Sequence, residues 1–132
     1  MRLHVFEWLD QPWLPSPLRD AMRRYLAASY RTTPLPGLWA QPLAQLLRDT
    51  GESQIVDLGS GAAGPIHLVL EALRTRGVTP VVVLTDLYPT ALPPDAPQTE
   101  GGPAIRAWRE PVDARAVPAA LGGVRTLFAT FH

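Results

Sequence analysis

The 132-residue chain contains no cysteine and no lysine, so that its twelve basic residues are all arginine. Without cysteine there is no disulfide framework, no thiolate metal site and no cysteine nucleophile. Twelve acidic residues balance the arginines, so the net charge indicates neither a nucleic-acid partner nor an anionic membrane surface. No apolar run approaches the length of a membrane span, and the first residues lack the pattern of a signal peptide. We therefore expect a cytoplasmic protein with one domain at most.

The most informative stretch is residues 55–65, with the sequence Ile-Val-Asp-Leu-Gly-Ser-Gly-Ala-Ala-Gly-Pro. Its apolar start predicts a short strand that is buried on both faces, as in a parallel sheet. The glycines allow a sharp turn and a close approach of the backbone to a ligand. Apolar residues at helical spacing then predict a helix over 65–76. A strand, a glycine turn and a helix in this order are typical of a nucleotide-binding site.

The glycine spacing alone does not identify the nucleotide. The pattern Gly59-x-Gly61-x-x-Gly64 matches the dinucleotide fingerprint, and Asp86 after the next apolar strand supplies the distal acid. Asp57 favours another ligand, because its carboxylate would repel a pyrophosphate. S-adenosylmethionine has no phosphate, and it carries an ammonium and a sulfonium. The alternative is that Asp57 only forms hydrogen bonds within the glycine turn.

Over residues 53–132 the sequence resembles the class I S-adenosylmethionine-dependent methyltransferases. The first matching motif is Val56-Asp57-Leu58-Gly59-Ser60-Gly61, and the second is Asp86 within Val82-Val83-Leu84-Thr85-Asp86-Leu87. A third match is Pro111-Val112-Asp113-Ala114, and a fourth is the apolar segment 126–132. The family often has a glycine where this chain has Ala63, and here the glycine follows as Gly64.

This resemblance implies methyl transfer from S-adenosylmethionine to a small-molecule or protein acceptor that the sequence does not identify. It assigns the methionine end of the cofactor to Asp57, Gly59, Ser60, Gly61 and Gly64, the ribose hydroxyls to Asp86 beside Leu87, and the adenine to Asp113 and the N–H of Ala114. Methyl transfer depends mainly on positioning, so no catalytic residue is predicted. The three histidines show no metal-ligand spacing, and no metal is expected.

The other predicted elements complete an α/β fold. Helices are expected at 17–30, capped by Ser16 with Leu18 and Tyr25 facing inward, and at 42–49 after a connector at 31–37. Strands are expected at 81–84, 104–109 and 124–130, and a short helix or turn at 114–121. Proline and glycine in 88–103 predict a functional or mobile loop instead of a crossover helix.

Together with the resemblance to this family, these elements predict an incomplete three-layer Rossmann-like sandwich with a mostly parallel sheet in the strand order 3-2-1-4. Residues 1–52 would form an N-terminal arm with two helices, and 53–132 the cofactor-binding half. The arm, with Trp8 and Trp13, would either anchor on the domain or cover the ligand. Since the family's sheet has seven strands, we expect the N-terminal part of a longer methyltransferase, or self-association through the exposed fourth strand.

Two other functions stay open. A nicotinamide-dependent oxidoreductase fits the glycine spacing, although Asp57 and the lack of a Tyr-x-x-x-Lys pair argue against it. A non-catalytic ligand-binding or interaction module would keep the fold without turnover. Ligand binding would separate the two cofactors, and a turnover assay would separate an enzyme from a module.

Overall fold

The computed structural model describes residues 15–61, 64–89, 92–95 and 104–128. In chain order its elements are α1 (Ser16–Thr32), α2 (Leu35–Thr50), β1 (Gln54–Asp57), α3 (Ile66–Arg74), β2 (Val81–Leu84), β3 (Ile105–Ala107) and β4 (Val124–Thr126). The four strands pair in parallel in the order β3-β2-β1-β4, which confirms the predicted α/β class and strand order. The predicted arm with Trp8 and Trp13 lies outside the described residues.

The central strands β1 and β2 are buried on both faces because successive side chains point to opposite sides of the sheet. Ile55 and Val82 are aligned in register and join the core under the helices. Val56 and Val83, the next aligned pair, join the cluster on the other face. This double burial explains why the sequence runs are continuously apolar rather than alternating.

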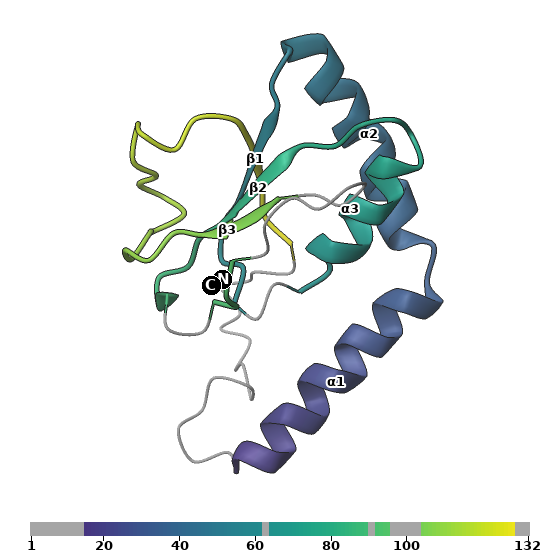
Figure 1. Cartoon of the computed structure of the whole chain (residues 1–132). Helices are drawn as coiled ribbons and strands as arrows, with labels where there is room; N and C mark the ends of the chain where they lie inside the picture. The colour runs from purple at the N-terminus through teal and green to yellow at the C-terminus, as the bar shows by residue number, and fades with distance from the viewer. Residues whose placement is uncertain (1–14, 62–63, 90–91, 96–103, 129–132) are drawn as a thin grey trace, which may run out of the picture.

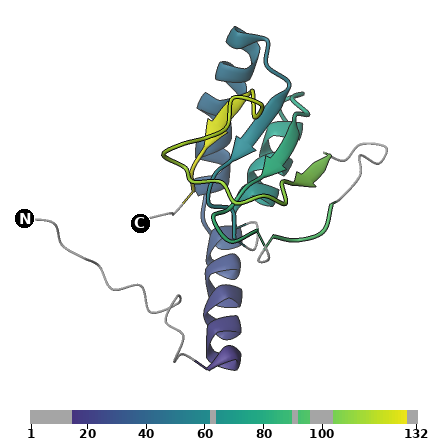
Figure 2. The same ribbon diagram turned by 90° about the vertical axis from the view of Figure 1, so that its left-hand side faces the viewer.

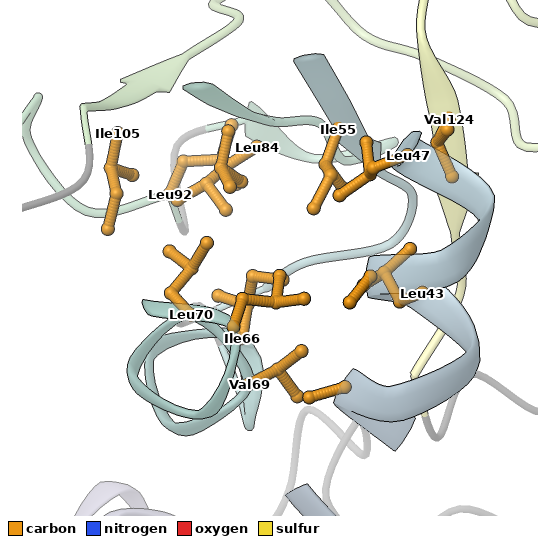
Figure 3. Close-up of a cluster of buried hydrophobic side chains, with 14 residues drawn as sticks. Leu43, Leu47, Ile55, Ile66, Val69, Leu70, Leu84, Leu92, Ile105 and Val124 are labelled. Atoms are coloured by element: carbon orange, nitrogen blue, oxygen red, sulfur yellow. The ribbon is translucent and has the colours of Figure 1, made fainter. Parts of the chain in front are cut away.

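The helices α2 and α3 lie side by side and cover one face of the sheet (Figure 1). Figure 3 shows their apolar side chains meeting those of the strands in a shared core. The buried residues are Ala40, Leu43, Ala44 and Leu47 from α2, and Ile66, Val69, Leu70 and Leu73 from α3. The α3 positions are the predicted ones. Each buried aliphatic side chain of this size stabilises the fold by about 1.5–3 kcal/mol.

The opposite face of the sheet is covered by the irregular segment 108–121 (Figure 1). Backbone hydrogen bonds hold this segment against the end of β2, from Trp108 N–H to Leu84 O and from Val112 N–H to Asp86 O, both 2.9 Å. Its part over 114–121, predicted as a short helix or turn, consists of turns. The third layer therefore contains coil in place of a helix.

The helix α1 extends away from the sheet (Figure 2). It begins at Ser16, and Pro15 holds the N-cap position, so the prediction of Ser16 as the cap is wrong. Leu18 and Tyr25, which were predicted to face inward, are 49% and 75% exposed. The amphipathic pattern predicted the helix correctly, but in the described part of the chain these two side chains do not enter a core.

The helix α2 begins seven residues earlier than the predicted start at 42, at Leu35. Pro36 suits the first turn, where its missing N–H costs nothing. Pro42 lies inside the helix, where a proline removes one backbone hydrogen bond. The buried face of α2 offsets that loss, so the helix continues through Pro42.

The approach to β4 is adapted to close contact with β1. Gly123 has φ +123°, and an added Cβ would lie 2.5 Å from the carbonyl oxygen of Gln54. The Gln54 side-chain amide donates to the carbonyl oxygen of Gly122 at 2.6 Å. These contacts dock β4 as an edge of the sheet, as predicted. Both β3 and β4 are shorter than predicted, and residues 129–132 lie outside the described part of the chain.

Candidate functional site

The candidate site lies where β1 and β2 end. Asp57 is the last residue of β1, the glycine turn follows it, and Asp86 comes shortly after β2. The turn is joined to the end of β2 by a hydrogen bond from Ser60 N–H to Thr85 O at 2.9 Å. In the order β3-β2-β1-β4, the strands β2 and β3 lie on one side of β1 and β4 lies on the other. The strand order therefore reverses between β1 and β4. Open α/β sheets bind ligands at the carboxyl ends of their strands, at such a switch point.

The carboxylate of Asp57 is buried, with the residue only 3% exposed. The hydroxyl of Ser60 donates to Oδ2 at 2.8 Å, and the hydroxyl of Thr126 donates to Oδ1 at 2.7 Å. Burial raises the pKa of Asp57 to about 6, while the bonds from Thr126 and Ser60 oppose that rise. The carboxylate is therefore mostly ionised near pH 7. Among the described residues its side-chain hydrogen-bond partners are two neutral hydroxyls.

The glycine turn has a conformation that favours glycine and leaves space beside the backbone. Gly59 and Gly61 have φ values of +65° and +50°. A Cβ added at Gly61 or Gly64 would meet nothing within 4 Å, so a ligand has room to approach there. Residues 62–63 lie outside the described part of the chain.

Asp86 connects the glycine turn to the end of β2. Its Oδ2 accepts the backbone N–H of Gly61 and its Oδ1 accepts that of Tyr88, both at 2.8 Å. This role within the fold was not predicted from the sequence. A carboxylate oxygen has two lone pairs, so each oxygen can still accept a ribose hydroxyl. Leu87, the neighbouring predicted residue, is 49% exposed.

Asp113 has a partner in its own turn. The guanidinium of Arg115 lies 2.8 Å from Oδ2, and the backbone N–H of Arg115 donates to Oδ1 at 2.8 Å. These bonds lower the pKa of Asp113 to about 2. The N–H of Val112 bonds the Asp86 carbonyl, so Asp113 directly follows a contact with the end of β2, and Ala114 is exposed. The structure thus joins Asp57, the glycine turn and Asp86 by hydrogen bonds, and it pairs Asp113 with Arg115.

Two hydrogen bonds to Asp57 were not predicted from the sequence. Thr126 was treated as part of an apolar strand, although a threonine within such a strand is itself a signal. Thr85 is fully buried, and its hydroxyl donates to the Asp57 carbonyl at 2.9 Å. Three hydroxyl residues therefore surround the end of β1: Ser60, Thr85 and Thr126.

Two surface cavities lie away from this edge of the sheet. One of about 350 Å³ is lined by the end of α1, the start of α2 and residues of α3 up to Thr75. The other, of about 590 Å³, is lined by α2 residues and Arg76. Neither is lined by a predicted site residue. The buried carboxylate of Asp57 is the stronger indication of a site. In the second cavity, the guanidinium of Arg76 already donates to the carbonyl oxygens of Ala72 and Gly37.

Within the described residues, no group of three or more histidine, aspartate or glutamate side chains could hold a metal ion. No described helix has both the length and the apolar character needed to cross a membrane. Comparisons of the chain with family models, with curated proteins and with solved structures give no match.

Proposed function

We propose that this chain binds S-adenosylmethionine at the carboxyl edge of its sheet and acts as a methyltransferase, or as the cofactor-binding part of one. The observation that carries the proposal is the burial of the Asp57 carboxyl group, whose side-chain hydrogen-bond partners among the described residues are two neutral hydroxyls. Buried charges in proteins are normally paired, because an uncompensated one is costly. A cationic ligand at this position would supply the missing charge.

The other groups at the edge fit the rest of such a ligand. Open space at Gly61 admits the ligand close to the backbone, and the free lone pairs of Asp86 can accept ribose hydroxyls. The bound cofactor supplies an electrophilic methyl group on its sulfonium. The chain's own residues then orient the ligand and compensate its charge, which is the larger part of what methyl transfer requires. The acceptor is a small molecule or a protein, and we place the reaction in the cytoplasm.

A non-catalytic module that binds the same ligand is the second candidate. The observation that favours it is that the groups joined at this edge, Asp57, the glycine turn and Asp86, are groups that bind and orient a ligand, which a module without turnover would also need. A nicotinamide cofactor is disfavoured, since the carboxylate of Asp57 would face its pyrophosphate. A methyl-transfer assay with candidate acceptors separates an enzyme from a module.

Thermal unfolding in the presence of ligands tests the proposal. S-adenosylmethionine at about 100 times its Kd should stabilise the fold by about 2.7 kcal/mol, because it binds the native state selectively. S-adenosylhomocysteine, which keeps the ammonium but lacks the sulfonium charge, should stabilise less at the same concentration. Stabilisation by NAD and not by S-adenosylmethionine would overturn the proposal.

A further inference from the structure

Thr126 is placed opposite Asp57 by the pairing of β4 with β1. The two residues are aligned in register, and the N–H of Leu58 donates to the Thr126 carbonyl at 2.9 Å. The Thr126 hydroxyl then donates to Oδ1 of Asp57 at 2.7 Å, across 69 positions of sequence. Both the backbone and the side chain of Thr126 therefore hold the end of β1.

The hydroxyls of Ser60 and Thr126 donate to different oxygens of the Asp57 carboxylate. Ser60 bonds one oxygen and Thr126 the other, so together they orient the carboxylate plane and favour its ionised form. Each oxygen keeps a lone pair for a ligand. Without the Thr126 hydroxyl, Oδ1 would be buried without its donor. Because an unpaired buried charge is costly, the pKa of the carboxyl group would rise and the group would take up a proton more readily.

Charged side chains are not what holds Asp57 ionised. The titratable groups on the surrounding elements are His67, Glu71, Arg74, Asp86, Arg106 and Arg125, together with Arg109, Glu110, Asp113 and Arg115 of the segment 108–121. Of the last four, Asp113 is paired with Arg115 and the others are exposed. Those on α3, β3 and β4 are exposed, and Asp86 bonds the backbone of Gly61 and Tyr88. Arg125 precedes Thr126, so its side chain points to the other face of the sheet. The physical causes that shift the pKa of Asp57 are its burial and the bonds from Thr126 and Ser60.

We infer that Thr126 is a positioning residue of the proposed S-adenosylmethionine site, whose hydroxyl presents the Asp57 carboxylate to the ligand as an anion in one orientation. The inference rests on the proposed function, and it makes β4 part of the cofactor site although β4 contributes no glycine and no acid. It also assigns a role to a threonine in a segment whose sequence indicates only an apolar strand.

The test compares Thr126→Val, which keeps the shape but lacks the hydroxyl, with Thr126→Ser, which keeps the hydroxyl. The pKa of Asp57, followed by NMR of its carboxyl carbon without ligand, should rise in the valine variant and stay near the wild-type value in the serine variant. At about pH 7 the valine variant should bind S-adenosylmethionine about tenfold more weakly, as expected for loss of a hydrogen bond to a charged group. Its affinity should recover as a higher pH ionises Asp57 again.

Arg125→Ala is the matched control, since it changes the neighbouring residue on β4 without touching the carboxylate. It should leave both the pKa of Asp57 and the affinity unchanged. If valine prevents folding, Thr126→Ala replaces it in the same comparison. An unchanged pKa of Asp57 in a folded variant without the hydroxyl would overturn the inference. A raised pKa together with a wild type that binds no S-adenosylmethionine would overturn the proposed function and leave the coupling of β4 to Asp57 supported.

Discussion

The end of β1 and the turn after β3 each present an aspartate at the same edge of the sheet, in opposite states. Asp57 is 3% exposed, is bonded to two hydroxyls, and has its pKa raised to about 6. The Asp113 side chain is 35% exposed, is paired with Arg115 at 2.8 Å, and has its pKa lowered to about 2. The charge of Asp113 is compensated by Arg115, whereas the side-chain partners of Asp57 among the described residues are neutral hydroxyls. We propose that this difference in charge compensation, more than position in a motif, distinguishes an acid that binds a ligand from one that supports the fold.

The largest expected effect is on the pH dependence of stability. Because the pKa of Asp57 is raised in the fold, its contribution is fully present below about pH 4 and is lost as the pH rises through about 6. The free energy of unfolding of the wild type, relative to that of Asp57→Asn, should fall by on the order of 3 kcal/mol over that window. Urea unfolding of both proteins at a series of pH values measures this. A difference that does not depend on pH would contradict the raised pKa.

Replacing Asp86 should have an intermediate effect, through the glycine turn. Asp86→Ala removes the acceptor of the Gly61 N–H and an acceptor for the ribose. We expect S-adenosylmethionine binding to weaken by about 1.5–3 kcal/mol, which calorimetric titration measures. The matched control is Asp95→Ala, because Asp95 also accepts a backbone N–H, that of Ala107 at 2.8 Å, away from the turn. Equal losses in both variants would mean that Asp86 acts only through general stability.

The smallest effect is expected for Asp113→Asn. The carboxylate is exposed and its charge is already paired, so both the unfolding midpoint and the cofactor affinity should stay unchanged. Since the pKa of Asp113 is lowered to about 2, any contribution of its charge is present at neutral pH and is lost only as the pH falls through that value. A clear loss of affinity on titration calorimetry would show that Asp113 leaves Arg115 to bind adenine, and it would break the contrast with Asp57.

The parts of the fold that follow from local sequence could be predicted. The strand ending at Asp57 follows from its continuous apolar run, and the apolar face of α3 follows from the helical spacing of its apolar residues. The hydrogen bond between Asp57 and Ser60, three residues apart, was foreseen as the alternative role of Asp57 within the turn. The order of the strands followed from the resemblance to a known family.

Contacts that depend on distant parts of the chain could not be predicted. The bond between Thr126 and Asp57 requires the parallel register of two strands 69 positions apart, which no local pattern specifies. The exposure of Tyr25 depends on where α1 lies relative to the sheet, and an amphipathic pattern does not determine that. The pairing of Asp113 with Arg115 is local, but nothing in the sequence ranks it against a ligand.

Calorimetric titration of S-adenosylmethionine and of NAD into the wild type and Asp57→Asn at about pH 7.5 tests the central claim most directly. The variant nearly preserves the shape of the side chain and removes its charge. We predict that the wild type binds S-adenosylmethionine and that Asp57→Asn binds it about tenfold or more weakly, the range for loss of a charged hydrogen-bond partner. NAD should bind neither protein better than S-adenosylmethionine binds the wild type. Equal or tighter binding of S-adenosylmethionine by Asp57→Asn would contradict the claim that the buried carboxylate compensates a cationic ligand.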